Sequence, residues 1–413
     1  MGLARLRKKA SAPLALLVVV AMLALASGCS VEEPSSTAVQ ATPDNAVPDE
    51  ELFTPIVGSV LDAPRIVRGT DDRDHVAYEL FLTNTIGQAV TVDALSVRGD
   101  GEEIMRLSGE DLLPWMRAMG APAPGYELAS GQSATVILDV ILPVGGTAPQ
   151  MLSHLIEFSP ETAMPPMITE QMKQTIVDAP VSPATPLVIG SPVSGDGWLD
   201  GNGCCGVSAH RSAINPINSA LYAPERFAID FVQLDEQSRI FDGPIDDLAS
   251  YAYYGAEILA VGDGPIVSMK WDLPEEAPGL HPVGLELNEY GGNHIVQDLG
   301  DGHYAFYAHL QGENPEGLAV GQKMSRGDVL GYLGNSGNTD MPHLHFHVMD
   351  SPLPLGSNGL PFVFESFTLT GTVNDAELAE CMSRSQSCGI TASDKTAMTK
   401  VMPLQQDVIS IAD

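Results

Sequence analysis

Short apolar runs with alternating apolar and polar positions recur along this chain from about residue 56 onward. Examples are HVAYELFLTN at 75–84, ATVILDVILPV at 134–144 and LSHLIEF at 152–158. Because successive side chains of a strand point to opposite faces of a sheet, this period of two predicts β-strands. Glycine (40 residues) and proline (31 residues) are plentiful, which favours turns over long helices. We therefore predict a mainly β protein.

Changes in composition divide the chain into segments. Residues 30–55 are rich in Ser, Thr, Pro and Glu and lack apolar periodicity, as expected of a flexible tether. The closely spaced strands at 56–165 predict an immunoglobulin-like β-sandwich. Prolines then indicate a linker at 166–190. A second β domain is predicted at 191–365, followed by a weakly patterned tail at 366–413 to which the sequence assigns no role.

The first residues, 1–29, have the pattern of an export signal. Four basic residues at positions 5–9 precede an apolar stretch at 14–26. The stretch is followed by Ser-Gly-Cys, which resembles the end of a bacterial lipobox and would place a lipid anchor on Cys29. An ordinary cleaved signal peptide is the alternative. Under either reading we expect export to the bacterial cell envelope, and Ser30 favours the outer membrane if the cell has one.

The chain is strongly acidic and has few cysteines. It carries 53 acidic against 20 basic residues, a formal net charge of −33, which argues against nucleic acid as a partner. Four cysteines remain besides Cys29, and an even number in an exported protein favours disulfides. Cys381 with Cys388 closes a short loop and is the preferred pair. The adjacent Cys204 and Cys205 could each reach the tail instead, and the sequence leaves this pairing open.

Three histidines alternate along GNSGNTDMPHLHFHVMD, residues 334–350: His343, His345 and His347. Alternate positions place them on one face of a strand, either as satisfied structural side chains or as part of a metal site. A further histidine, His309, lies in FYAHL, and Asp230 lies among apolar residues in RFAIDF. Zinc prefers imidazole nitrogen and carboxylate oxygen as ligands. Taken together, these residues favour a hydrolytic zinc site over a purely structural face.

Four segments give a specific resemblance: RFAIDFV, YGAEILAVGDGPIV, YAFYAHL and VGQKMSRGDVLGYLGNSGNTDMPHLHFHV. Their order and spacing resemble those of the lysostaphin/LytM-type zinc metallopeptidases, over about residues 200–350. These enzymes cut peptide crosslinks of bacterial peptidoglycan. The resemblance implies an antiparallel β-sheet domain with an open groove, a bound Zn²⁺ ion and peptidase activity.

The resemblance also implies roles for individual residues. Asp230 and His345 match the family's aspartate and histidine zinc ligands. His309 and His343 match the two histidines that assist the attacking water and the developing oxyanion. His347 lies beyond the family motif, where it either supports the ligands from behind or is merely structural.

One ligand of the family pattern is missing. The pattern is His-x-x-x-Asp, but the residue four before Asp230 is Arg226, which stays protonated and cannot bind zinc. Either His210, in the upstream segment CCGVSAHRSAINP, replaces the missing ligand, or the site is degenerate and holds no catalytic zinc. Retention of the other site residues favours the first reading.

We therefore predict an exported zinc metalloendopeptidase that hydrolyses peptide bonds, most simply in peptidoglycan crosslinks. The alternative is a catalytically degenerate LytM-type domain that binds the cell wall or activates another wall hydrolase. A metallopeptidase acting on a secreted protein is a third possibility. The N-terminal β-sandwich would hold the second domain away from the membrane or dock an envelope protein partner.

Overall fold

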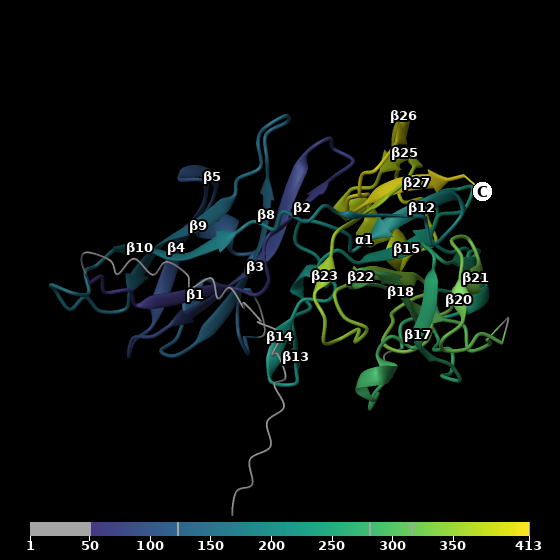
Figure 1. Ribbon diagram of the computed structural model, residues 1–413, viewed down its shortest axis with the longest axis horizontal. Coiled ribbons are helices and arrows are strands. Elements are labelled where there is room, and N and C mark those ends of the chain that lie inside the picture. The colour runs from purple at the N-terminus through teal and green to yellow at the C-terminus, as the bar shows by residue number, and fades with distance from the viewer. Residues whose placement is uncertain (1–50, 122–123, 281, 315–316, 413) are drawn as a thin grey trace, which may run out of the picture. The chain divides into compact units, whose positions relative to one another are not determined.

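The computed structural model describes residues 51–121, 124–280, 282–314 and 317–412 (Figure 1). The predicted signal peptide, the lipid anchor on Cys29 and nearly all of the predicted tether lie outside these residues. Within the described residues, no helix has both the length and the apolar character needed to cross a membrane. Residues 53–413 form one compact unit.

Two antiparallel sheets make up the N-terminal part of this unit. One sheet has the order β1-β3-β8-β6 with β2 beside β3, and the other has the order β10-β9-β4-β5 with β7 beside β4. The strands are β1 Ile56–Val60, β2 Arg65–Arg68, β3 Asp74–Asn84, β4 Val90–Gly99, β5 Glu102–Ser108, β6 Met116–Ala118, β7 Glu127–Leu128, β8 Ser133–Ile141, β9 Met151–Pro160 and β10 Met172–Pro180.

The two sheets share an apolar core, so they form a β-sandwich. Tyr78 and Leu80 of β3 lie in this core together with Ile156 and Phe158 of β9. The sandwich extends past its predicted end at residue 165, because β10 pairs with β9 although its residues were expected in the linker. Its alternating pattern is interrupted by a β-bulge, which explains why the sequence did not predict this strand. An immunoglobulin-like topology stays a prediction.

A second, larger sheet forms the C-terminal part, in the order β20-β17-β18-β19-β22-β15-β12-β27-β25-β26 with β23 beside β22. Its strands are β12 Gly195–Gly201, β15 Ile229–Gln233, β17 Gly264–Lys270, β18 Asn293–Gly300, β19 His303–Leu310, β20 Lys323–Met324, β22 Leu344–Met349, β23 Gly359–Leu360, β25 Phe367–Thr372, β26 Thr391–Met398 and β27 Asp407–Ile411. Shorter pairs lie around it: β11 Leu187–Ile189 with β24 Phe362–Phe364, β13 Asn215–Ile217 with β14 Ala220–Tyr222, and β16 Glu257–Leu259 with β21 Val329–Tyr332.

The predicted tail is part of this sheet. β27 pairs with β12 and with β25, so residues 366–413 include strands that extend the sheet beyond the domain boundary predicted at residue 365 (Figure 1). Between β25 and β26 in the chain lies the helix α1, Asp375–Ser383, whose N-cap Asn374 accepts a hydrogen bond from the backbone of Glu377. The sequence suggested no role here because the pairing partner, β12, lies about 200 residues earlier, beyond what local patterning can reveal.

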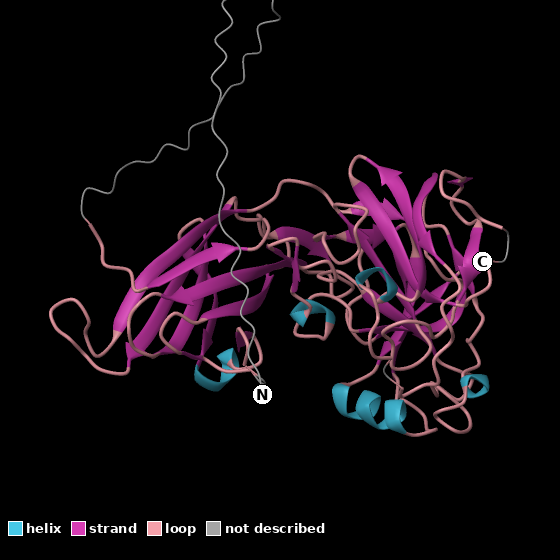
Figure 2. Cartoon of the chain, turned by 90° about the horizontal axis from the view of Figure 1, so that it is seen from below, coloured by secondary structure: helices cyan, strands magenta, loops and turns pink. Residues whose placement is uncertain are grey.

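Two disulfides join the four described cysteines. Cys381 in α1 is bonded to Cys388, the pairing that the sequence favoured. Cys204 and Cys205 are bonded to each other, and neither reaches the tail. Strands dominate the chain outside the loops (Figure 2), so the prediction of a mainly β protein is confirmed.

Candidate metal centre

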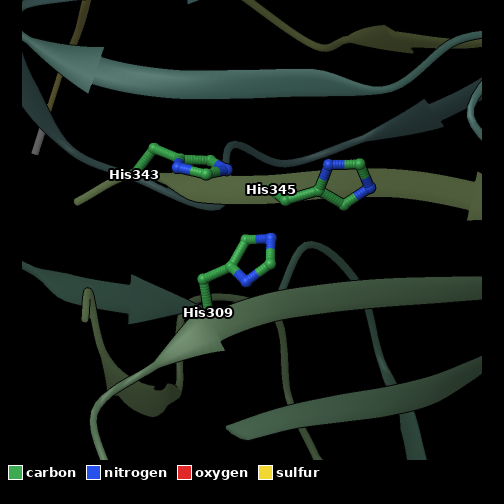
Figure 3. Close-up of side chains that lie close together, drawn as sticks. All are labelled: His309, His343 and His345. Atoms are coloured by element: carbon green, nitrogen blue, oxygen red, sulfur yellow. The ribbon is translucent and has the colours of Figure 1, made fainter. Parts of the chain in front are cut away.

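Three neighbouring strands bring the predicted site residues together. In the pairing of β15 with β22, Asp230 stands directly opposite His345. On the far side of β22, His345 pairs with Ala308, the residue before His309 at the end of β19. His343 precedes β22 and His345 lies within it, while His309 comes from the neighbouring strand with its ring close to theirs (Figure 3).

His210 reaches the same place from a loop. It begins a short 3₁₀ turn, His210–Ser212, and its Nε2 lies 3.1 Å from Oδ2 of Asp230. Its Nδ1 lies 3.2 Å from the carbonyl oxygen of Ala228, to which an Nδ1–H donates. Its ring centroid is 4.7 Å from that of His345. This hydrogen bond occupies Nδ1, so Nε2 is the nitrogen that faces the carboxylate and would serve as the metal ligand.

Arg226, four residues before Asp230, points to a different partner. Its guanidinium contacts the buried carboxylate of Glu79 on β3, with Nε 2.8 Å from Oε2. Its Nη1 lies 3.3 Å from Oδ2 of Asp62. The side chain therefore stands in a buried ion pair, and it contributes no donor atom to the group around Asp230.

His210, Asp230 and His345 form a group suited to Zn²⁺. One potential ligand atom from each lies within 4.8 Å of the others, in a largely buried setting. The two imidazoles and the carboxylate are the donor set that zinc prefers, and the carboxylate offsets part of its charge. His309, His343 and His345 satisfy the same distance criterion but supply no anion. We therefore favour the group that contains Asp230.

The orientation of His345 supports this assignment. Its Nδ1 lies 3.0 Å from Oδ1 of Asp230, and its Nε2 lies 2.9 Å from Nδ1 of His347. With Nδ1 as a ligand atom, Nε2 would carry the proton and donate a hydrogen bond to Nδ1 of His347. A second residue that holds the remote nitrogen in this way is the usual partner of a metal-binding histidine.

The two other histidines differ in their electrostatic surroundings. Burial, together with His343 and His345 nearby, holds the pKa of His309 well below its usual range. Burial also opposes charge on His343, but the Asp230 carboxylate outweighs it and raises the pKa of His343 above its ordinary value. The two rings are 4.7 Å apart between centroids. His309 is thus kept neutral near pH 7, while His343 is protonated more readily than an ordinary histidine.

The carboxylate of Asp230 is the electrostatic centre of the group. Burial alone would raise its pKa, but His210 and His343 hold the pKa well below its usual range. The same carboxylate raises the pKa of His210 to about 9 although burial opposes this shift. The group therefore combines a buried anion with imidazoles that it attracts, as a cation site requires.

Asn202 is a site residue that the sequence analysis missed. Its Nδ2 donates a 2.9 Å hydrogen bond to Oδ2 of Asp230. Its φ of 55° lies in the left-handed region, which asparagine tolerates better than most residues. The dipeptide Asn202-Gly203 after β12 was a turn signal that could have directed attention to it.

A cavity of about 620 Å³ opens beside these residues. Its walls include all five candidate site residues together with the apolar side chains of Leu287, Tyr290, Leu353 and Met382. Met382 belongs to α1, so the C-terminal segment lines the cavity as well as extending the sheet. A peptide could thus approach the group around Asp230 from solvent.

A third group, His75, Asp139 and Cys205, also meets the distance criterion for metal ligands. Cys205 is bonded to Cys204 and offers no thiolate in this state. His75 is hydrogen-bonded to Asp139, whose carboxylate lies 3.0 Å from Nδ1 of the histidine. This group is therefore a structural contact between the sandwich and the loop that carries Cys205.

Comparison with known proteins finds a match to one peptidase family over part of this chain. Residues 247–356 match the model of Peptidase family M23. The glycyl-glycine endopeptidase ALE-1 of Staphylococcus capitis is 32% identical over 96 residues, which cover 23% of this chain and 22% of that protein. The matched region therefore spans less than a quarter of this relative's length. It confirms the predicted resemblance to LytM-type peptidases.

Two solved structures are similar at lower identity. The catalytic domain of the antimicrobial peptidase lysostaphin from Staphylococcus simulans is 21% identical, with 40% of this chain and 88% of that chain covered and a TM-score of 0.22. A zinc-containing peptidase from Vibrio cholerae is 11% identical, with 66% and 77% covered and a TM-score of 0.23. The family match covers residues 247–356, which include His309, His343 and His345 but neither His210 nor Asp230.

Proposed function

We propose that this chain, which contains a domain of peptidase family M23, is a zinc metalloendopeptidase of the bacterial cell envelope. The observation that carries the proposal is that His210 lies against Asp230 and His345. His210 would replace the histidine ligand of the family pattern, whose position is taken by Arg226 in this chain. Peptides of peptidoglycan are the proposed substrate, since the curated relative is named a glycyl-glycine endopeptidase. Export and a lipid anchor on Cys29 belong to the same proposal.

The proposed ligands are Nε2 of His210, a carboxylate oxygen of Asp230 and Nδ1 of His345. Bound zinc would supply a Lewis acid and lower the pKa of a water molecule in the cavity. Asn202 and His347 would orient Asp230 and His345 through the contacts at 2.9 Å. Three protein ligands leave a coordination position open, which distinguishes a catalytic from a structural zinc site.

His309 and His343 would handle the protons. His309 donates Nδ1–H to the carbonyl of Ser336 at 2.8 Å, so its Nε2 can accept a proton from the attacking water. His343 donates Nδ1–H to the carbonyl of Met341 at 2.8 Å. Its Nε2 lies 3.3 Å from Oδ1 of Asp230, and in its protonated form this nitrogen would stabilise the carbonyl oxygen of the substrate as negative charge develops on it.

Zinc content of the purified mature protein tests the assignment. We expect one zinc per chain by mass spectrometry in the wild type and in His309→Ala, and loss of zinc in His210→Ala and His345→Ala. Hydrolysis of isolated sacculi should require zinc and should fall by about 100-fold or more in His309→Ala, which loses the general base. His294→Ala, a buried histidine at the cavity wall, is the matched control and should keep both zinc and activity.

Each alternative outcome has a definite meaning. Zinc lost in His345→Ala but kept in His210→Ala would leave a metal site without the relocated ligand. A wild type that takes up no zinc even after reconstitution would favour the degenerate, wall-binding or regulatory domain, for which the arginine at position 226 is the supporting observation. Zinc binding with activity on proteins but none on sacculi would move the substrate to secreted proteins.

A further inference from the structure

The outer face of β3 carries a buried carboxylate that faces the second domain. Val76, Tyr78 and Leu80 point into the sandwich core, while Ala77 packs into the core around the large sheet. Glu79 lies on the same face as Ala77 and is 1% exposed. A carboxylate this deeply buried must be paired, because burying an isolated charge is very costly.

Two arginines of the second domain pair with Glu79, and both are 1% exposed. Nη2 of Arg211 lies 3.3 Å from Oε1. Nε of Arg226 lies 3.1 Å from Oε1 and 2.8 Å from Oε2, and its Nη2 also contacts Oε2. One carboxylate of the sandwich thus holds two guanidinium groups of the other domain.

Arg211 directly follows His210. Besides Glu79, its guanidinium contacts three backbone carbonyls: Cys205 in its own loop, and Tyr78 and Leu138 on β3 and β8 at 3.2 Å and 3.0 Å. The turn that carries His210 is therefore attached to the sandwich by its next residue. Backbone contacts alone leave this cation without a countercharge, and Glu79 supplies it.

The two segments that carry proposed ligands differ in how they are held. Asp230 lies in β15, which is hydrogen-bonded to β22 on one side and to β12 on the other. His210 lies in a three-residue 3₁₀ turn within a loop, and no strand pairing fixes it. A loop depends on side-chain contacts for its position, so loss of Glu79 should act mainly on His210.

We propose that Glu79 of the N-terminal sandwich is a positioning residue of the metal centre, acting through Arg211 to hold His210 against Asp230. The inference rests on the proposed zinc site and deepens it, because it makes a residue of one domain a determinant of metal affinity in the other. In this chain the sandwich would then support the metal site, in addition to the spacer role that the sequence led us to expect.

The test compares zinc affinity among variants of the full mature protein, by competition with a chelator of known affinity. We expect Glu79→Gln to weaken zinc binding by about 10-fold, the low end of the effect of removing a direct partner of a metal ligand, because Glu79 acts through Arg211. Arg211→Met should have a similar effect while leaving Glu79 paired with Arg226, so it serves where Glu79→Gln folds poorly. Glu157→Gln, which removes a partly exposed carboxylate paired with Arg106 and Lys173, is the matched control and should bind zinc as the wild type does.

Amide hydrogen exchange of the metal-free protein provides a readout independent of zinc. The amides of Arg211, Ser212 and Ala213 are hydrogen-bonded within the turn, to Ser208 and His210. In Glu79→Gln and Arg211→Met these amides should exchange faster, while those of β15 and β22 keep their wild-type rates. Faster exchange throughout β15 and β22 would indicate a general loss of stability and would overturn the positioning role.

The inference and the proposed function fail in different ways. Wild-type protein that binds zinc, with affinity unchanged in Glu79→Gln and Arg211→Met, would overturn this inference and leave the metallopeptidase standing. Wild-type protein that binds no zinc would overturn the metallopeptidase, and with it the part assigned to Glu79 in metal binding. Weaker zinc binding in the two variants, with faster amide exchange confined to the turn that carries His210, is the result that supports both the metallopeptidase and the role of Glu79.

Discussion

At the scale of single residues, Asp230 organises the candidate centre because its two carboxylate oxygens face different partners. Oδ1 lies 3.3 Å from Nε2 of His343 and 3.0 Å from Nδ1 of His345. Oδ2 lies 3.1 Å from His210 and accepts a hydrogen bond from Asn202. A residue with so many polar neighbours can bind a metal with one oxygen and keep its orientation through the other.

His347 should matter for zinc affinity without touching the metal. In the proposed arrangement its Nδ1 accepts a hydrogen bond from the protonated Nε2 of His345, and its side chain is 1% exposed. We expect His347→Leu to weaken zinc binding by about 10-fold or more, since the ligand ring then loses the partner that fixes its tautomer. Chelator competition measures the effect.

His294→Leu is the control for this prediction. Both histidines are buried and pack against Phe306, with centroid distances of 5.2 Å for His294 and 5.1 Å for His347. His294 donates to the carbonyl of Gly292 and not to a proposed ligand. Equal losses of zinc affinity in the two variants would show that the packing around Phe306, and not the contact with His345, is responsible.

At the scale of elements, the C-terminal segment supports the site from two directions. β27 pairs with β12, the strand next to β15 and its Asp230. α1 supplies Leu378 and Met382 to the cavity wall. The loop after the helix is attached to residues 238–241, since the amide of Cys388 donates to the carbonyl of Ser238 and Ser385 donates to Phe241.

The Cys381–Cys388 disulfide should stabilise this element. Both cysteines are fully buried, and the loop that they close has a sequence separation of 7. We expect the Cys381→Ala/Cys388→Ala double variant to lose about 2–3 kcal/mol of unfolding free energy, mainly because the unfolded chain gains the entropy of an open loop. Urea denaturation measures the loss.

Reducing agent separates the contributions of the two disulfides. Reduction of the double variant can break only Cys204–Cys205, so any further loss of stability belongs to that pair. A double variant as stable as the oxidised wild type would show that the loop is held by its hydrogen bonds to residues 238–241 without help from the covalent link.

At the scale of the whole molecule, contacts between the sandwich and the large sheet tie the chain together. Val67 and Ala77 of the sandwich belong to the apolar core around the large sheet. Thr70, which follows β2, donates a hydrogen bond to Asp407 at the start of β27. The predicted boundary between the domains is therefore crossed by apolar, polar and ionic contacts.

Asp407 should make stability fall as the pH rises through the weakly acidic range. Burial raises its pKa to about 6 although hydrogen bonds from Thr70 and Leu404 oppose the shift; its ordinary value is 3.8. Between these two values the folded protein holds a proton that the unfolded chain has released, so raising the pH lowers the free energy of unfolding. A shift of this size corresponds to roughly 3 kcal/mol, present below the lower value and lost above the higher one.

Asp407→Asn should therefore gain stability relative to the wild type as the pH is raised from 4 to 7. Denaturation in urea at several pH values measures this difference between the two proteins. Asp394→Asn, a change at an exposed aspartate on β26, is the control for loss of one negative charge. A constant difference between Asp407→Asn and wild type across this range would contradict the raised pKa of Asp407.

Local sequence determined much of the fold and identified most residues of the candidate site. Alternation with a period of two identified strands such as β3, β8 and β22, because side-chain direction in a strand follows from covalent geometry. The same rule placed His343 and His345 on one face, and the motif around them led to the family. The segment after β22 and the strand β10 escaped prediction, since their partners are set by long-range pairing or obscured by a bulge.

Tertiary structure alone decided how His210 comes to Asp230 and why Arg226 does not bind metal there. Sequence chemistry excluded arginine as a ligand and offered His210 as a replacement, but a separation of 20 residues leaves the distance between His210 and Asp230 undetermined. In the folded chain, Glu79 pairs with Arg211 and Arg226 across the domain boundary. Such a buried ion pair depends on residues more than 100 positions apart in sequence, so no local pattern could have revealed it.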